Sequence, residues 1–430
     1  MNIKSKFFLQ FSTVIYSTFT SIFETSLLYR TFSLEILGTF FLLQSSTTLI
    51  SSLLNIRIVE ITQVFLNKYG LSEKTNFEDL SKLYSFYLIT LIPLIPSSFI
   101  LIYIFKNIAI YSSSNFLLIT FFISSTIILN QLTGFWYAYQ YYKNKSQNIS
   151  IYEILKKLFS LIIVFFVYLV NPSKNGILYI SIAYFIKALF FSIYEFREIW
   201  SLINSRFLYS IQNPILIFKE FTQYKSEVSS SIKTSYLRNL FSSIVKNGDI
   251  TIAGIIAGPN GSAILKIIKS VPMIILQPSQ YINNFSIAYI NRSTKSYKNI
   301  FKDFINKSFS LLPIALLISI IYYFISSKFL MFVYRVQLSN LEIIIQSSLL
   351  FISFFVLIFS WAIPLHIYKN RYKLITINSL IGSLISVINL LIGFLFGIQE
   401  FIYISLIFGI FTTFILNTIS HLYKIKFHDK

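Results

Sequence analysis

The sequence predicts an all-α polytopic membrane protein, and three observations support that fold class. Hydrophobic residues make up 55% of the 430 residues, whereas charged residues make up only 12%, about half of the share that is usual in soluble proteins. Apolar windows of about 20 residues, the length that crosses a bilayer as a helix, recur along the whole chain. Most basic residues lie in short segments between these windows, as the positive-inside rule expects.

About twelve transmembrane helices are expected, in two six-helix bundles. The apolar windows lie near residues 7–29, 36–57, 84–105, 115–138, 152–171, 176–198, 229–257, 261–290, 304–326, 341–367, 373–395 and 401–423. The longest hydrophilic piece divides these windows into two equal sets. We therefore expect an N-terminal six-helix bundle over 1–205, a cytoplasmic linker over 206–228 and a C-terminal six-helix bundle over 229–430.

The distribution of basic residues predicts the orientation of the chain. With a cytoplasmic N-terminus, most lysines and arginines fall on the inner side, and the outer turns carry only Arg30, Lys106, Lys174, Lys328 and Arg335. This asymmetry predicts that both termini are cytoplasmic and that the protein is a multi-pass protein of the cell inner (cytoplasmic) membrane, in contact with membrane lipids. The same loop placement explains the net charge of +20, so no nucleic-acid partner is expected.

The composition also excludes several chemistries. The chain has no cysteine, which rules out disulfides, thiolate nucleophiles and zinc–sulfur sites. It contains no G-x-G-x-x-G, P-loop or H-E-x-x-H motif, and no metal or cofactor is expected. No long outer loop is present to hold a catalytic domain, so the chain is not expected to be an enzyme.

The stretch over 230–292 carries charged residues at membrane depth, where each one costs about 2.5–3.5 kcal/mol on insertion scales. These residues are, in order, Arg238, Lys246, Asp249, Lys266 and Lys269. Intramembrane charges of this kind normally face a bundle interior or a watery cavity. Because the surplus is cationic, it favours an anionic substrate.

The spacing of these charges predicts two stripes that face one space. Lys246 and Asp249 are three residues apart and share a helix face, as do Lys266 and Lys269. The segment 258–261 reads Gly-Pro-Asn-Gly, which predicts a tight turn. The two helices should therefore be antiparallel neighbours.

Structural alternatives exist for each charge. Lys246 and Asp249 form a neutral pair in one interpretation, and Arg238 and Lys266 extend to opposite membrane surfaces in another. Lys269 is harder to explain in this way, because it lies about 12 Å into its helix and has no acidic partner in that helix.

Other polar and aromatic residues within the spans are further candidates. Glu24 is either a proton or cation site or a buried neutral acid, and Lys187 lies near the middle of the sixth span. Gln277 and Asn283 either bind sugar hydroxyls or bond neighbouring helices. Trp136 and the tyrosines after it are better explained by an interfacial aromatic belt than by a sugar-stacking platform.

The two halves of the chain resemble each other weakly. Glu24 is followed 14 residues later by Gly38, and Asp249 is followed 12 residues later by Gly261. Six spans in each half would make this a parallel repeat, related by a pseudo-two-fold axis normal to the membrane.

The sequence from Lys246 onward resembles the polysaccharide, or O-antigen, flippase family. That family belongs to the superfamily that also holds the multidrug exporters and the lipid II flippase. The resemblance lies in KNGDITIAGIIAGPNGSAILKI, in VPMIILQPSQYI and, near the N-terminus, in SLEILGTFFLLQSSTTLISSLLNIRI. Ser262 stands where the family often has tyrosine after the glycine of the turn.

This resemblance implies translocation of an undecaprenyl-diphosphate-linked oligosaccharide, as in lipopolysaccharide O-antigen synthesis, from the cytoplasmic to the outer leaflet. The substrate-binding candidates are then Arg238, Lys246, Lys266, Lys269, Lys187, Gln277 and Asn283. Asp249 and Glu24 are candidates for coupling to H+ or Na+, and a polysaccharide polymerase is a candidate partner. The alternatives are a small-molecule antiporter of the same fold or, less favoured, a membrane polymerase or acyltransferase of the same pathway.

Overall fold

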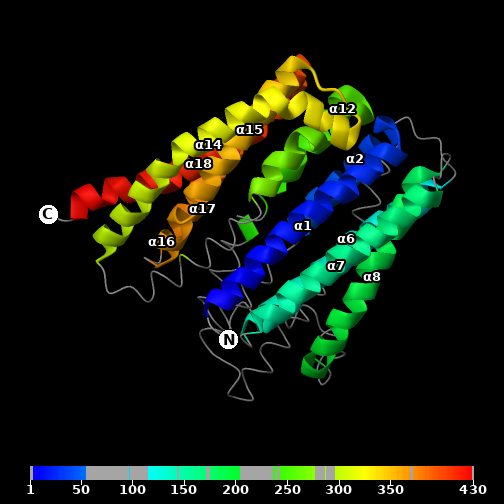
Figure 1. Ribbon diagram of the computed structural model, residues 1–430, viewed down its shortest axis with the longest axis horizontal. Coiled ribbons are helices and arrows are strands. Elements are labelled where there is room, and N and C mark those ends of the chain that lie inside the picture. Colours follow the sequence, from blue (N-terminus) through cyan, green and yellow to red (C-terminus); the bar gives the residue numbers. More distant parts are fainter. Residues whose placement is uncertain are drawn as a thin grey trace. The chain divides into compact units, whose positions relative to one another are not determined.

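In the computed structural model, all regular secondary structure among the described residues is helical. The described residues are 3–54, 96, 115–142, 145–170, 175–203, 236–237, 240, 243–276, 286, 296–368 and 371–428. The helices, shown in Figure 1, are α1 (Ile3–Thr31), α2 (Leu34–Leu54), α6 (Phe116–Tyr142), α7 (Ser146–Val170), α8 (Gly176–Ile203), the π-helix η1 (Ile244–Gly248), α12 (Asp249–Leu276), α14 (Tyr297–Tyr334), α15 (Asn340–Ile358), α16 (Ala362–Tyr368), α17 (Tyr372–Phe396) and α18 (Gln399–His428).

Seven helices in the described part of the chain are long and apolar enough to cross a membrane. They include most of α8, all of α12, and the apolar parts of α14, α17 and α18. The expected all-α polytopic membrane class is therefore confirmed. The expected third span, over 84–105, lies outside the described residues except for Pro96.

Two helices have ends that the local sequence explains. Ser339 caps α15, because its hydroxyl accepts the Glu342 N–H while the Glu342 carboxylate accepts the Ser339 N–H, a reciprocal arrangement that satisfies two donors at the helix start. At the other end of the preceding helix, Arg335 adopts a left-handed conformation with φ 55° and ends α14. These signals define the short turn between α14 and α15.

The chain forms two compact units. The first unit comprises Met1–Leu9 and Thr39–Ser243, and the second comprises Gln10–Gly38 and Ile244–Lys430. In the first unit, α8 packs against α6 and α7. In the second, α12 packs against α15 and α18, α14 packs against α15, and α17 lies alongside α18 (Figure 1).

Residues 10–38 join the second unit through long-range contacts with α12 and α14. The Tyr29 hydroxyl donates to the Ala263 carbonyl at 2.9 Å, and the Arg30 guanidinium donates to the Phe332 carbonyl at 2.6 Å. The Tyr29 ring also meets the Tyr334 ring edge to face. The predicted division into bundles at 206–228 falls outside the described residues and stays a prediction.

The surfaces of several helices are strongly apolar. On α14, Phe309, Leu317 and Phe324 are all exposed, and α17 likewise exposes Leu384 and Leu391. Contiguous exposed apolar surface of this kind fits a helix that faces lipid. The opposite sides of the helices hold the packed interior, such as the cluster of Ile300, Phe301, Phe359, Trp361, Ala362 and Leu365.

Candidate functional site

The helix α12 is a hairpin rather than one straight helix. Its backbone is non-helical at Gly258, where φ is 69° and ψ is −173°, and Pro259 follows. Glycine suits this position because a positive φ is strained for other residues. The turn expected from the Gly-Pro-Asn-Gly sequence is therefore present, and we refer to 249–257 as the first arm and 259–276 as the second arm.

Two contacts show that the arms run back along each other. The Ser262 hydroxyl donates to the Ile250 carbonyl at 2.9 Å, and Lys269 bonds Asp249 across 20 positions. In a continuous helix, residues 20 positions apart would be separated by about 30 Å. The predicted antiparallel packing is thus present.

Glycines permit this close packing. A Cβ atom at Gly261 would lie 2.5 Å from the Ala257 Cβ, so the arms meet through small residues. A Cβ atom at Gly38 would lie 1.7 Å from the Pro259 carbonyl oxygen. The glycines of the two predicted repeat elements, Gly38 and Gly261, therefore both lie at close contacts around one turn.

The centre of the hairpin is a buried ion pair between the arms. The Lys269 amine lies 2.9 Å from both carboxylate oxygens of Asp249, and the Ile250 N–H donates to Asp249 Oδ1 at 2.8 Å. Asp249 is 0% exposed and Lys269 is 4% exposed. Bonds that involve ionised groups are stronger than neutral ones, so each charge is compensated locally.

This pairing differs from the one considered in the sequence analysis. There, Lys246 was the expected partner of Asp249, because the two residues share a helix face. In the structure, the partner of Asp249 is instead the amine of Lys269. Lys269 is the residue for which the sequence analysis found no acidic partner in its own helix. Lys246 lies in η1, and its side chain lies outside what the structure describes.

Two further residues surround the pair. Lys266 is half-buried and lies one helical turn before Lys269. Gln346 of α15 is fully buried and donates from Nε2 to the Ile267 carbonyl at 3.1 Å. The second arm is thus tied to α15 beside the ion pair, and the side chains of Asp249, Lys266 and Lys269 together carry a net positive charge.

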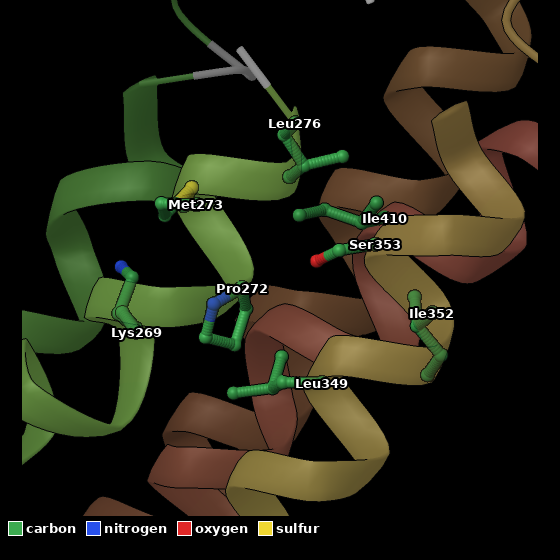
Figure 2. A pocket seen from close by; sticks show the side chains of 8 residues that line it. All are labelled: Lys269, Pro272, Met273, Leu276, Leu349, Ile352, Ser353 and Ile410. Atoms are coloured by element: carbon green, nitrogen blue, oxygen red, sulfur yellow. The ribbon is translucent and has the colours of Figure 1, made fainter. Parts of the chain in front are cut away.

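A shallow pocket reaches Lys269. Its remaining lining residues are Pro272, Met273, Leu276, Leu349, Ile352, Ser353 and Ile410, and its cavity volume is about 10 Å³, which is room for about one water molecule. Figure 2 shows the α12 side chains on one side and those of α15 and Ile410 on the other, with the Ser353 hydroxyl pointing into the space. Asp249 does not line this pocket.

The other predicted site residues lie in different surroundings. Glu24 of α1 is 7% exposed, which fits either interpretation given above. The Lys187 amine donates to the Ser160 hydroxyl at 2.8 Å and lies 5.0 Å from the centre of the Tyr184 ring. Lys187 therefore belongs to a contact between α7 and α8 in the first unit. Arg238, Gln277 and Asn283 lie outside the described residues.

A second polar cluster, which the sequence analysis did not identify, connects α6 and α8. The Glu198 carboxylate accepts from Trp136 Nε1 and from Gln140 Nε2, each at 2.6 Å, and from the Tyr194 hydroxyl at 3.2 Å. Trp136 is only 1% exposed. Trp136 is therefore packed inside the helix interface, where its indole N–H donates to the half-buried Glu198, and the interfacial-belt interpretation stays a prediction.

A neighbouring glutamate extends this cluster to α7. Glu195 is 1% exposed, accepts a hydrogen bond from the Tyr152 hydroxyl and lies 4.0 Å from the Lys156 amine. The signal in the sequence was the pair of acids three residues apart near the C-terminal end of the sixth predicted span. Their aromatic partners are about 40 to 60 positions away, as for Tyr152 with Glu195 at 43 and Trp136 with Glu198 at 62.

The fold defines the class of protein as an all-α polytopic membrane protein. Neither a protein-family model nor a curated protein sequence matches the chain. Its fold is similar to that of the lipid II flippase MurJ in an inward closed conformation, with a TM-score of 0.70 and 15% identity, over 97% of this chain and 87% of that chain. It is also similar to an inward-facing multidrug resistance MATE family transporter of the MOP superfamily, with a TM-score of 0.58 and 11% identity, over 99% and 95% of the two chains.

These two similarities identify the fold across almost the whole chain. At 15% and 11% identity they show the fold alone, so the superfamily that the sequence resemblance implies stays a prediction. Membership of the polysaccharide flippase family is a finer statement and stays a prediction.

Proposed function

We propose that this protein is a flippase that moves an undecaprenyl-diphosphate-linked oligosaccharide from the cytoplasmic to the outer leaflet of the inner membrane. The observation that carries the proposal is the similarity of its fold, over 97% of the chain, to a flippase named for a lipid substrate. Alternating access between two bundles would move the head group, while the prenyl tail stays in the bilayer.

The charge of the hairpin supports an anionic head group. Asp249 compensates one of the two lysines of the second arm, so the three side chains keep a net charge of one positive. A diphosphate is an anion, so this formal positive charge attracts it. Lys269 and Lys266 are the proposed anion-binding residues, together with Arg238 and Lys246 of the preceding segment.

Further predicted residues complete the proposed roles. Lys187 would bind substrate from the first unit, and Gln277 and Asn283 would bind sugar hydroxyls. Asp249 and Glu24, both buried in the second unit, are the proposed groups for coupling to H+ or Na+. The proposed partner protein is a polysaccharide polymerase, which would use the translocated product.

A small-molecule antiporter is the second candidate, favoured by the similarity to a multidrug resistance transporter. Exporters of cationic drugs need acidic cavities, whereas the described charges of the hairpin sum to a positive value. A membrane polymerase or acyltransferase is the less favoured alternative, and neither similar structure is an enzyme by its name.

The test is a deletion strain that has no second flippase. We expect lipid-linked oligosaccharide to accumulate in the cytoplasmic leaflet and surface polysaccharide to be lost, and the wild-type gene to restore both. Normal surface polysaccharide in the deletion strain would refute the proposal. A loss of drug resistance with unchanged polysaccharide would favour the antiporter.

Point variants in the same strain test the hairpin. Lys269→Ala should reduce surface polysaccharide relative to the amount of the protein in the membrane, whereas Lys307→Ala, which removes an exposed lysine of α14, should not. Full activity of Lys269→Ala would remove the second arm from the anion site.

A further inference from the structure

The ion pair of the hairpin places two proposed functional groups in direct competition. Lys269 is a proposed anion-binding group and Asp249 a proposed coupling group. In the structure, however, the Lys269 amine is bonded to the Asp249 carboxylate. A lysine ammonium has three N–H donors, and two of them point at the Asp249 carboxylate, 2.9 Å from each oxygen. A phosphate oxygen would use the same donors.

We propose that Asp249 is an internal competitor for the anionic group of the substrate. In the structure its carboxylate occupies the Lys269 amine, and a bound phosphate would replace that carboxylate. This inference rests on the proposed function, and it adds that the affinity of the site for an anion is set by the carboxylate that must first be displaced.

Stability alone does not explain the pair. Removing two charges from water costs several kcal/mol for each ion, and apolar side chains of similar size often hold a fold equally well. The arms of the hairpin already have other contacts, namely the Ser262–Ile250 hydrogen bond and the close packing at Gly261. The charges therefore need an explanation beyond holding the arms together.

The pocket reaches one partner of the pair. Lys269 is among its lining residues and Asp249 is not (Figure 2). Apart from Ser353, the other walls are apolar, with Pro272, Leu276 and Leu349 among them. The chemistry of these walls and of the lysine suits an apolar chain that ends in a phosphate, and the pocket would have to widen to admit it.

One neighbouring group favours the exchange, and another limits the cost of leaving the Asp249 carboxylate without its cation. Lys266, one turn before Lys269, adds a second positive charge for an incoming anion. When Lys269 is taken by phosphate, the Asp249 carboxylate keeps the hydrogen bond from the Ile250 N–H. Competition of this kind is reciprocal: whatever strengthens the Asp249–Lys269 pair weakens anion binding by the same factor.

Binding of farnesyl diphosphate to the purified full-length protein in detergent tests the inference. We expect Asp249→Asn to bind this probe about tenfold more tightly than the wild type, a change that corresponds to the loss of one modest competing interaction. Lys269→Met and the double variant Asp249→Asn with Lys269→Met should both bind more weakly than the wild type. Lys307→Met is the matched lysine control, and farnesol measures the contribution of the apolar chain alone.

Asp249→Asn leaves a buried ammonium without its carboxylate and so could fail to fold. A second protein preparation keeps the test decisive in that case. The chain has no cysteine, so the double variant Asp249→Asn with Lys269→Cys folds with a neutral pair and carries one thiol. Aminoethylation of that thiol restores a lysine-like cation after folding. We expect this modification to create tight farnesyl diphosphate binding, and the same modification of Lys269→Cys alone, with Asp249 retained, to restore only wild-type binding.

The outcomes separate the inference from the proposed function. The Asp249→Asn protein and the aminoethylated double variant could both bind farnesyl diphosphate no more tightly than the wild type. That result would overturn the proposal that Asp249 competes with the substrate, whatever the polysaccharide assay shows. Normal surface polysaccharide in the deletion strain would overturn the flippase, whatever the order of affinities among the variants.

Discussion

At the residue scale, the hairpin shows how a buried charge obtains its partner. Lys269 has no acid within its own helix, and Asp249 has Lys246 one turn away, so local spacing favours the wrong pair. The turn at Gly258 reverses the chain and brings Lys269 within 2.9 Å of both Asp249 oxygens. A buried ion is stable only when it is paired, so the fold of the hairpin and the pairing depend on each other.

The stability of this pair can be measured directly. Lys269→Met should destabilise the protein by about 3–5 kcal/mol, because it leaves a buried carboxylate without its cation. The double variant Asp249→Asn with Lys269→Met should recover most of the loss. Thermal unfolding in detergent is the measurement, with Lys307→Met as the control. A double variant as unstable as the single variant would contradict the pairing.

The glycines around the turn provide a second residue-scale prediction. Gly38→Ala should be strongly destabilising, because its Cβ would lie 1.7 Å from a backbone oxygen of Pro259. Gly258→Ala has open space around its Cβ but a positive φ, so it should cost about 1–3 kcal/mol from backbone strain alone. Unfolding temperatures should therefore decrease from wild type to Gly258→Ala to Gly38→Ala, and the reverse order of the two variants would count against this packing.

At the element scale, the first unit is held together by buried polar contacts as well as by apolar packing. Glu198 of α8 binds Trp136 and Gln140 of α6, and Glu195 of α8 binds Tyr152 of α7. Inside a membrane protein such bonds connect helices whose apolar sides gain little by leaving lipid. The three helices therefore owe part of their alignment to two glutamates.

Removal of one glutamate should expose this dependence. Glu198→Ala leaves the Trp136 N–H and a Gln140 donor without their acceptor in a buried interface, which costs about 1–3 kcal/mol for each group. Glu342→Ala removes an acid from an exposed helix cap and should cost less. Thermal unfolding followed by tryptophan fluorescence compares the two variants. Equal stability of the two would show that the α6–α8 contact does not depend on Glu198.

At the scale of the whole molecule, the hydropathy pattern and the fold agree. Six of the seven described helices that are long enough to span a membrane lie where the apolar windows predict them, and the seventh, Asp249–Leu276, holds the turn between two predicted spans. The fold matches that of a lipid II flippase over almost all of the chain. The orientation of the chain in the membrane stays a prediction from the distribution of basic residues.

Cysteine labelling tests that orientation without background, because the native chain has no cysteine. Asn175 and Ser296 are both exposed, and the positive-inside pattern predicts the first outside and the second inside. A membrane-impermeant thiol reagent added to intact cells should label Asn175→Cys and not Ser296→Cys. The opposite pattern would invert the topology, and with it the expected side of both termini and of Asn213 in the linker.

The sequence by itself determined the membrane class, the helical spans and the turn at Gly258, because each of these depends on residues close together in the chain. Hydropathy sums over about 20 neighbours, and a tight turn is encoded within four residues. The partner of Asp249, the burial of Trp136 against Glu198 and the packing of residues 10–38 with the second unit were decided only by the tertiary structure. These contacts join positions 20, 62 and more than 200 residues apart, and a periodic pattern gives the face of a helix but not the side chain that another helix brings to it.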